Sequence, residues 1–478
     1  MTGATLSSLQ RLARDRNARM IDIRYTDLAG AWHHVTLPAA KLDERLLEEG
    51  VSFDSSSVAG FKRVEGGDMV VVPDPATATL EPFFAEPTLA MIGTIREADT
   101  LEPYARDPRT IAQRAEALLA SLGLADRSLW SPEFEFYVFD HIASTNTNNR
   151  SSYEIDAETG HWRTGTENSR HLGLRVPYQG GYHLMPPLDD LHDLRSAMCL
   201  AIQDAGIPVK YHHHEVGGAG QCEIEIGFLP LLAAGDAVMI IKYLIRMVAR
   251  KHNRIATFMP KPLNNEAGSG MHFHQMLLAG PQPLFFDPKG HAGLSDLARS
   301  YVAGLLLHAP ALLAITNPSS NSYRRLTTGF EAPTRLFYGL ANRSAAVRIP
   351  KQARRPEEKR IEFRCPDGTC NPYLALAAQL LAGLDGVRQK LDPSAMGFGP
   401  YDFNVFQLPE AEREKIRSAP ASLEESLQAL ERDCEFLQPG RVFPEDFVPV
   451  WTKLLREKGV EPMKRRTHPY EVELYFDV

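Results

Sequence analysis

Pro132-Glu-Phe-Glu135 places two carboxylates two positions apart, with a phenylalanine between them. Three other stretches share this alternation of polar and apolar residues: Glu223-Ile-Glu225, His272-Phe-His274 and Arg360-Ile-Glu-Phe-Arg364. Because residues two apart on a β-strand point to the same face, each stretch would present a charged row on one side and apolar side chains on the other. Any one of them alone is typical of a half-exposed strand. The four together favour a sheet whose polar face lines a cavity and whose apolar face packs on helices.

The predicted cavity is rich in carboxylates. Its candidate metal ligands are His272 and five glutamates, namely Glu133, Glu135, Glu215, Glu223 and Glu362. So many carboxylates cannot all stay ionised in one cleft without compensation, because like charges raise each other's pKa. Divalent cations supply that compensation, and oxygen-dominated ligation favours Mg²⁺ or Mn²⁺ over Zn²⁺ or Cu²⁺. His212-His-His214 could indicate a softer metal, but adjacent strand residues point to opposite faces, so packing is the favoured interpretation.

Arginine is the second feature of the later chain. The candidates are Arg324, Arg325, Arg343, Arg348, Arg360 and Arg364. The planar guanidinium group suits phosphate and carboxylate because it binds both with two parallel hydrogen bonds. Enzymes that transfer phosphoryl groups use hard cations and arginine side chains to stabilise the charge of the transferring group. The sequence contains no Walker A motif or kinase signature, so it predicts a phosphoryl-transfer site of another design.

The composition limits the class of protein. The 478 residues are 44% hydrophobic and 23% charged, the balance of an ordinary globular protein. With 52 basic and 60 acidic side chains, the net charge of −8 argues against nucleic-acid and anionic-membrane partners. The five cysteines form no Cys-x-x-Cys pair, which predicts a reduced, cytoplasmic protein. No signal peptide is expected at the N-terminus, and the apolar stretch 301–316 predicts a buried helix.

The pattern of predicted secondary structure changes at Asp107-Pro108. Before this point, short strand patterns at 20–25, 32–37, 69–72 and 89–95 alternate with turns and one helical run at 41–49, which predicts a small α+β unit with a mostly antiparallel sheet. Asp107 as N-cap and Pro108 at the first helical position begin a helix that ends at Gly123. We therefore expect two domains, 1–106 and 107–478. Further helices are expected at 191–204, 237–252, 295–308, 372–391 and 423–432, and surface loops at 144–152 and 397–401.

With these residues assembled, the chain resembles the type I glutamine synthetases of bacteria almost end to end. Matching motifs in the first half are Phe53-Asp54-Ser-Ser-Ser57, Asp68-Met-Val-Val-Val-Pro-Asp74, Pro132-Glu-Phe-Glu135, Gly180-Gly-Tyr182 and His212-His-His-Glu-Val216. Those in the second half are Gly268-Ser-Gly-Met-His272, Asn321-Ser-Tyr-Arg-Arg325, Gly329-Phe-Glu-Ala-Pro333, Asn342-Arg343, Arg348-Ile-Pro350 and Asn371-Pro-Tyr373. The resemblance implies an α+β fold with a small β-grasp N-terminal domain and a catalytic domain built on an incomplete antiparallel β-barrel surrounded by helices. It also implies a homo-dodecamer of two stacked hexamers.

The resemblance further implies a role for each candidate residue. One Mg²⁺ or Mn²⁺ ion would be held by Glu135, Glu215 and Glu223, and a second by Glu133, His272 and Glu362. L-Glutamate would be held by Arg325, Arg364 and the Gly268 backbone. The phosphates of ATP would be bound by Arg343, Arg348 and Arg360, with His274 near the nucleotide. The amine pocket would be formed by Asp54, Ser57, Tyr182 and Glu331, with Asp54 helping to deprotonate the amine.

Residues that depart from the family pattern bear on the acceptor. Ala267 stands where glutamine synthetases carry an asparagine, in a flap over the glutamate and ammonia sites. The other departures are Ser55 for glycine, Cys222 for asparagine, Met276 for serine and Ala341 for arginine. Paralogues that join glutamate to organic amines also vary around the flap, and loss of a polar flap residue is expected to widen the pocket.

We therefore expect an ATP-dependent ligase that makes γ-glutamyl phosphate and transfers the glutamyl group to a primary organic amine. Ammonia, as in an authentic glutamine synthetase, is the alternative acceptor. An inactive paralogue is disfavoured because all six metal positions are present.

The order of these residues along the chain predicts a site shared between subunits. Asp54 and Ser57 lie in the N-terminal unit, whereas every candidate metal ligand follows residue 130. The aromatic C-terminal segment 471–478 reads as a strand that would be an aggregation hazard unless it were paired. In the family that segment docks into the opposite ring, which supports the expected homo-oligomer.

Overall fold

The computed structural model describes residues 5–163, 173–329 and 331–478, so the extreme N-terminus and Phe330 of the 329–333 motif lie outside it. The N-terminal sheet has the order β2-β1-β6-β4-β3, with β5 paired to β6. Its strands are β1 (Met20–Thr26), β2 (Trp32–Pro38), β3 (Val51–Asp54), β4 (Asp68–Pro73), β5 (Thr79–Leu80) and β6 (Thr88–Glu97). Within the described chain, β1 and β6 form the sheet's only parallel pair. The two helices beside it are α1 (Leu6–Asp15) and α2 (Glu44–Glu49).

The second sheet has ten strands, seven of them in the order β10-β11-β7-β14-β18-β17-β16, and curls into an incomplete barrel. Those seven are β10 (Val209–His214), β11 (Gln221–Ile226), β7 (Arg127–Phe139), β14 (Met271–Ala279), β18 (Ile361–Phe363), β17 (Ala345–Ile349) and β16 (Arg335–Leu340). Short strands β12 (Leu229–Pro230) and β13 (Ile255–Thr257) pair with β7, and β15 (Gln282–Pro283) pairs with β14. The four polar–apolar stretches lie on β7, β11, β14 and β18, which are consecutive neighbours, so the predicted polar-faced sheet is confirmed.

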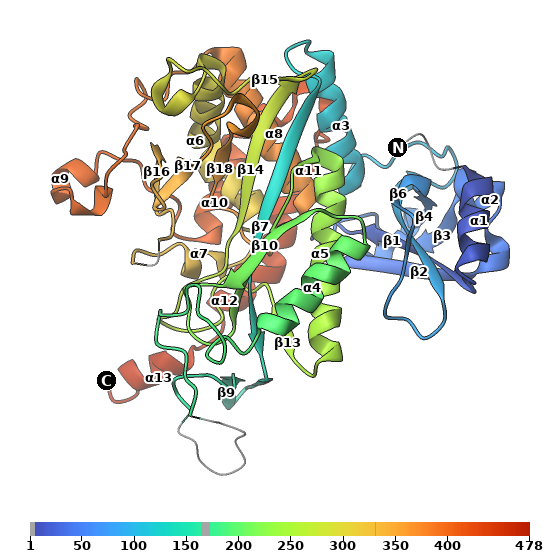
Figure 1. Ribbon diagram of the computed structural model, residues 1–478, viewed down its shortest axis with the longest axis horizontal. Helices are drawn as coiled ribbons and strands as arrows, with labels where there is room; N and C mark the ends of the chain where they lie inside the picture. The colour runs from blue at the N-terminus through green and yellow to red at the C-terminus, as the bar shows by residue number, and fades with distance from the viewer. Residues whose placement is uncertain (1–4, 164–172, 330) are drawn as a thin grey trace.

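Long helices pack against this sheet and against one another. The helices are α3 (Pro108–Ser121), α4 (His192–Asp204), α5 (Leu231–Lys251), α6 (Asp296–Thr316), α8 (Pro372–Gln389), α10 (Leu423–Arg432) and α11 (Phe447–Leu455). In Figure 1, α3 and α5 lie between the long strands β7 and β14 and the N-terminal sheet, drawn in blue. Short helices α7 (Ser322–Arg325), α9 (Glu410–Arg413) and α12 (Glu461–Lys464) complete the domain.

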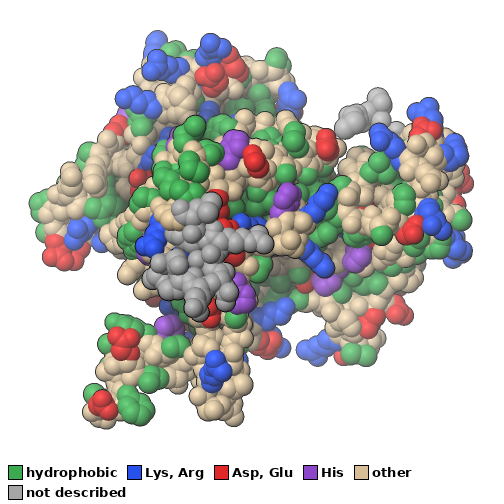
Figure 2. All heavy atoms as spheres, turned by 60° about the horizontal axis from the view of Figure 1, so that its bottom comes forward, with side chains coloured by type: hydrophobic (Ala, Val, Ile, Leu, Met, Phe, Trp, Pro, Cys, Tyr) green, Lys and Arg blue, Asp and Glu red, His purple; other side chains and the backbone are tan. Residues whose placement is uncertain are grey.

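Most predicted helices are confirmed within a few residues. Asp107 caps α3 by accepting from the Thr110 amide, with Pro108 at the first helical position. The predicted helix at 295–308 continues through Pro310 to Thr316 and so merges with the buried stretch. Of the described helices, α6 is the one long and apolar enough to cross a membrane, and 83% of its apolar window is buried in the protein. In the space-filling view, acidic and basic side chains are mixed over the visible face (Figure 2).

Two sequence predictions about local structure are wrong. The segment 144–152, expected as a loop, belongs to a hairpin of β8 (His141–Thr147) and β9 (Arg150–Asp156), whose backbone hydrogen bonds outweigh the polar composition. The tail at 471–478 was expected as a strand, but its residues up to Tyr475 belong to the helix α13 (Pro469–Tyr475). His468 and Glu471 form a capping box and Pro469 occupies the first helical position, and both features favour a helix.

Buried polar contacts fix the N-terminal sheet against the catalytic helices. Arg109 on α3 donates to both carboxylate oxygens of Asp236 on α5 at 2.9 Å, to Asp74 at 2.8 Å and to Thr94 at 3.2 Å. The Asn371 amide, at the start of α8, donates to the carbonyl of Asp27 at 3.0 Å. These bonds join residues far apart in sequence, so the N-terminal unit has a defined position on its own chain.

Candidate active site

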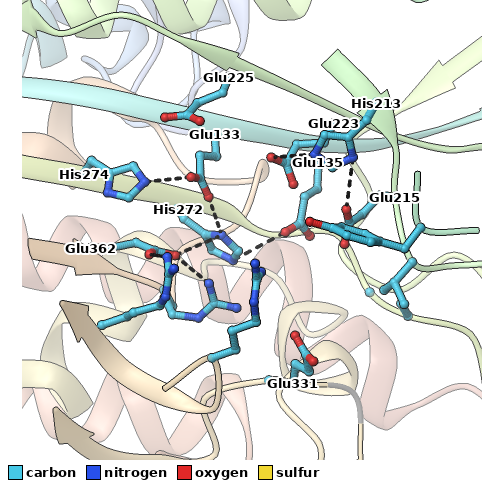
Figure 3. Close-up of a pocket in the computed structure, with 18 of the residues that line it drawn as sticks. Glu133, Glu135, His213, Glu215, Glu223, Glu225, His272, His274, Glu331 and Glu362 are labelled. Carbon is cyan, nitrogen blue, oxygen red and sulfur yellow. Dashed lines mark hydrogen bonds and ion pairs between the residues drawn. The ribbon is translucent and has the colours of Figure 1, made fainter. Parts of the chain in front are cut away.

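The register of four strands brings the predicted ligands together. Glu133 on β7 lies opposite His272 on β14, and Glu135 lies opposite Glu223 on β11. On the other side of β14, His274 lies opposite Glu362 on β18. Figure 3 shows these side chains converging on one cavity. All six predicted metal ligands line that cavity, although its electrostatic character differs between the two halves.

The first half contains Glu133 and Glu362, whose charges are compensated by protein groups. Glu133 accepts from His274 Nε2 at 2.7 Å and approaches His272 Nδ1 at 3.1 Å. Glu362 is fully buried and accepts from Arg348 and Arg364, each at 2.5 Å. Burial alone would raise the pKa of Glu362, but the charges of Arg364, His274 and Arg348 together outweigh it and lower that pKa to about 2. The two histidines likewise hold the pKa of Glu133 well below its usual value against the effect of burial.

The second half contains Glu215 and Glu223, whose charges are poorly compensated. Burial raises the pKa of both groups well above the ordinary value, assisted by the charges of Glu223 and Glu135 for Glu215 and of Glu133 and Glu135 for Glu223. His213 lies between them, with Nδ1 3.5 Å from Glu215 and Nε2 3.4 Å from Glu223. Within the described chain, Glu215 Oε2 is buried and has no hydrogen-bond partner. A hard cation would stabilise these oxygens, so the donor set fits a divalent metal ion.

Two groups of side chains have ligand atoms within 4.8 Å of one another, which is close enough to share an ion. They are Glu133, His274 and Glu362, and His213, Glu215 and Glu223. The expected sets contained His272 and Glu135 in place of His274 and His213. His272 Nε2 lies 3.6 Å from Glu135 and His272 Nδ1 lies 3.7 Å from Glu362, so His272 stands between the two groups.

Arginines form one part of the cavity wall. Arg325, Arg343, Arg348, Arg360 and Arg364 line the cavity, whereas Arg324 is exposed and does not. Arg325 is buried and held by the carbonyls of Cys365 at 2.8 Å and Arg364 at 3.1 Å. Arg360 Nε approaches His274 Nδ1 at 3.3 Å. The wall therefore presents fixed positive charge toward the carboxylates, which suits an anionic substrate placed between them.

Three further predicted residues lie at this cavity and two do not. Tyr182, Gly268 and Glu331 are among its lining residues, and Glu331 lies across from the other carboxylates (Figure 3). Asp54 and Ser57 are absent from the described lining. Asp54 is exposed at the end of β3, where hydrogen bonds from Ser56 and then Ser57 lower its pKa.

Sequence reasoning missed several lining residues. His213 was assigned to packing, although its spacing of two from Glu215 would have placed both on one face. Glu225 also lines the cavity, and its partner is Lys210, one strand away. Tyr211 and Gln352 carry no sequence signal of their own, because only the folded chain brings them to this wall.

The cavity holds two sets of glutamate and histidine side chains that fit hard cations, together with arginines of fixed positive charge. This combination is typical of a metal-dependent phosphoryl-transfer enzyme. The family profile "Glutamine synthetase, catalytic domain" matches residues 105–475, and "Glutamine synthetase, beta-Grasp domain" matches residues 17–98. A glutamine synthetase of Mycolicibacterium smegmatis is 46% identical over the full length of both chains. The chain therefore belongs to the glutamine synthetase family, whose members are ligases that use glutamate, ATP and divalent metal ions.

Solved structures agree with this assignment. The chain is similar to a glutamine synthetase of Plasmodium falciparum, with a TM-score of 0.89, 27% identity and 99% of both chains covered. It is also similar to a structure described as "Apo GmaS without ligand", with a TM-score of 0.79 and 25% identity over 98% of this chain and 99% of that one. The resemblance inferred from the motifs and the expected α+β fold with a β-grasp domain are confirmed.

Proposed function

We propose that this protein joins the γ-carboxylate of L-glutamate to ammonia, with ATP cleaved to ADP and phosphate. The ligase chemistry rests on one observation, the cavity in which two hard-cation groups face the arginine wall. The choice of ammonia is supported by the name of a relative that is 46% identical over its full length.

A primary organic amine is the second candidate acceptor and is the one that the sequence alone favours. Its specific support is Ala267, which lines the cavity with a methyl group where the family pattern has an amide. A smaller, apolar side chain there leaves more room beside the glutamate site.

In the proposed reaction, an oxygen of the γ-carboxylate attacks the γ-phosphorus of ATP and ADP leaves. The amine nitrogen then attacks the acyl carbon of γ-glutamyl phosphate, and inorganic phosphate leaves. Phosphorylation is needed because a free carboxylate would have to expel oxide, a very poor leaving group. The amine loses a proton to the proposed base Asp54, so atoms and charges balance.

The protein's own groups bind and orient the substrates in this proposal. Arg325, Arg364 and the Gly268 backbone hold glutamate, while Arg343, Arg348 and Arg360 bind the phosphates, with His274 near the nucleotide. Tyr182, Glu331, Ser57 and Asp54 form the amine pocket. The proposed ligands of two Mg²⁺ or Mn²⁺ ions are Glu135, Glu215 and Glu223, and Glu133, His272 and Glu362. Bound divalent ions supply charge neutralisation for the transferring phosphoryl group.

We further propose two domains, 1–106 and 107–478, and a homo-oligomer in which the amine pocket is completed by a neighbouring subunit. This is supported by the separation of Asp54 and Ser57 from the residues that line the cavity. A dodecamer of two hexameric rings is the expected assembly.

Phosphate release from ATP, measured with glutamate and each of ammonia, methylamine, ethanolamine, putrescine and aniline, tests the function. We expect release to require glutamate and a divalent ion, and kcat/KM to be highest with ammonia. A higher kcat/KM with an organic amine would favour the second candidate. Absence of glutamate-dependent release with every acceptor would overturn both.

A further inference from the structure

A short segment beside the cavity is held almost entirely by side chains from other parts of the fold. In residues 265–268, each of four successive carbonyls accepts a side-chain hydrogen bond. The donors are Tyr178 and Gln179 to Asn265, Lys261 to Glu266, Tyr137 to Ala267 at 2.8 Å, and Gln221 to Gly268 at 3.0 Å. We call residues 265–268 the clamped loop. Irregular segments normally satisfy their carbonyls with backbone or water, so four successive carbonyls held by side chains are unusual.

Lys261 and Tyr137 hold the Glu266 and Ala267 carbonyls, and so fix the two peptide groups that carry the Ala267 and Gly268 amides. Gln221 holds the next peptide group, on the other side of Gly268. The Ala267 and Gly268 amides have no hydrogen-bond acceptor within the described part of the chain. Both residues line the cavity beside Arg325. Backbone N–H groups without a protein partner, held in place at a pocket wall, are suited to an anionic oxygen of a bound substrate.

The clamped loop is also tied to the strands that carry the candidate metal ligands. Glu266 is buried and accepts from the Gly218 amide at 2.9 Å, and Gly270 donates to Glu135 Oε2 at 2.6 Å. A Cβ on Gly218 would lie 2.4 Å from Glu266 Oε1, so only glycine permits this close approach. Gln221, the anchor of Gly268, lies two residues before Glu223 on β11 and also accepts from the Gly217 amide at 2.6 Å.

We propose that Tyr137 and Gln221 are positioning residues that set the Gly268 amide against a carboxylate of the bound amino-acid substrate. Neither side chain lines the cavity, so both act through the clamped loop. Tyr137 is fully buried on β7, and its hydroxyl is fixed by the same strand that carries Glu133 and Glu135. The clamped loop and the candidate metal ligands Glu133 and Glu135 are thus both positioned by β7. This inference rests on the proposed function, because it takes glutamate as the amino-acid substrate.

Tyr137→Phe and Gln221→Met test the inference, because each removes a donor while preserving most of the side-chain volume. We expect KM for glutamate to rise about tenfold in each variant, the effect of one buried hydrogen bond, with KM for ATP nearly unchanged. The Tm increase caused by ADP and Mg²⁺ should also be retained, whereas the increase caused by glutamate should shrink.

Tyr373→Phe is the matched control. The Tyr373 hydroxyl is also fully buried and donates at 2.7 Å, but to Asp236, away from the cavity. A loss of Tm without a change in KM for glutamate is expected in this control. The inference is overturned if Tyr137→Phe and Gln221→Met keep the wild-type KM for glutamate, or if Tyr373→Phe raises that KM equally. Failure of the proposed function is distinguishable, because the wild-type protein itself would then show no glutamate-dependent phosphate release.

Discussion

Glu362 is fully buried and Glu215 is partly buried in the same cavity, but the pKa values of the two carboxylates are shifted in opposite directions. Glu362 is paired with two arginines, whereas Glu215 faces other carboxylates. The carboxylate charge of Glu362 therefore contributes to stability, and that of Glu215 opposes it in the absence of a cation. This difference leads to a prediction for stability as well as activity.

Glu215→Gln should raise the Tm of the metal-free protein by about 1–3 °C, because it removes an unfavourable buried charge. The same change should reduce the Tm increase caused by Mn²⁺ and lower phosphate release by about two orders of magnitude. Differential scanning fluorimetry with chelator and with Mn²⁺ provides the measurement. Glu362→Gln is the matched control, and it should lower the metal-free Tm because two arginines lose an ionised partner. If both variants change the metal-free Tm in the same direction, the cavity does not consist of one half with compensated and one half with uncompensated carboxylate charge.

Ala267→Asn should raise the ratio of kcat/KM with ammonia to kcat/KM with methylamine by about tenfold. This is the discrimination that a pocket usually achieves between substrates that differ by one methylene group. The reason is that a restored amide would occupy space beside the acceptor, where Ala267 lines the cavity. Met276→Ser restores another family residue, at a position that does not line the described cavity, and should leave the ratio unchanged. An unchanged ratio in Ala267→Asn would exclude this residue as a determinant of the acceptor.

The residues of the site could be predicted to the extent that strand periodicity reports them. Glu133, Glu135, Glu223, His272 and Glu362 alternate with apolar residues, so one face of a sheet was expected to hold them. The anchors of the clamped loop could not be found in this way. Tyr137 and Ala267 are 130 positions apart, and their contact depends on how β7 packs in the finished fold.

Among the helices, α6 and α8 are joined by a buried ion-paired histidine. His308 on α6 lies 3.0 Å from Asp385 on α8 and 2.9 Å from Asp433, and its ring stacks on Phe436 at 4.3 Å. Burial alone would lower the pKa of His308, but the hydrogen bonds and charges of Asp433 and Asp385 raise it above its ordinary value. Arg388 also bonds Asp385, and Arg417 lies near Asp433, so the cluster holds charges of both signs.

His308 should therefore stabilise the protein in a pH-dependent manner. A pKa that is higher in the folded state contributes stability below the unfolded value of about 6.5, and this contribution is lost as pH rises through the folded value. The Tm of the wild type should exceed that of His308→Gln by most at about pH 6, and the difference should narrow toward about pH 9. Thermal unfolding of both proteins across this range provides the measurement. A difference that stays constant or grows with pH would contradict the assignment.

The helices and the C-terminal tail also show which secondary structure can be predicted from sequence patterns and which cannot. Helices with caps and long apolar stretches, such as α3 and α6, could be predicted because local chemistry determines them. The tail could not, because an eight-residue segment fits a strand or a helix according to what surrounds it. In α13 the side chains of Tyr470, Val472, Leu474 and Tyr475 are exposed, so this helix has apolar surface available to a partner.

At the scale of the whole molecule, the N-terminal sheet is fixed in a position that keeps Asp54 away from its own cavity. Arg109 and Asn371 bind this sheet to α3, α5 and α8, and Figure 1 shows α3 and α5 between it and the strands of the site. Arg109 is nearly fully buried, and its bonds to Asp74 and Asp236 would have to break for the sheet to move. A neighbouring subunit is therefore the expected source of Asp54 and Ser57 in the amine pocket.

Mixed oligomers test this arrangement. Subunits carrying Asp54→Ala and subunits carrying Glu135→Ala should each have little phosphate-release activity alone. After dissociation and reassembly together, some interfaces would pair an intact Asp54 with an intact set of metal ligands, so activity should return. At equal mixing, random pairing predicts recovery of about a quarter of the wild-type rate per site, because each partner is intact in half of the subunits.

Refolding each variant alone is the control, and native mass spectrometry should establish that the reassembled oligomers are mixed. Activity that stays at the level of the separate variants in confirmed mixed oligomers would mean that each site is built within one chain. That result would require the Arg109 contacts to open during turnover, because the described position of the N-terminal sheet separates Asp54 from the cavity. Recovery would instead show that the same contacts hold Asp54 outward for the next subunit, so that assembly completes the site.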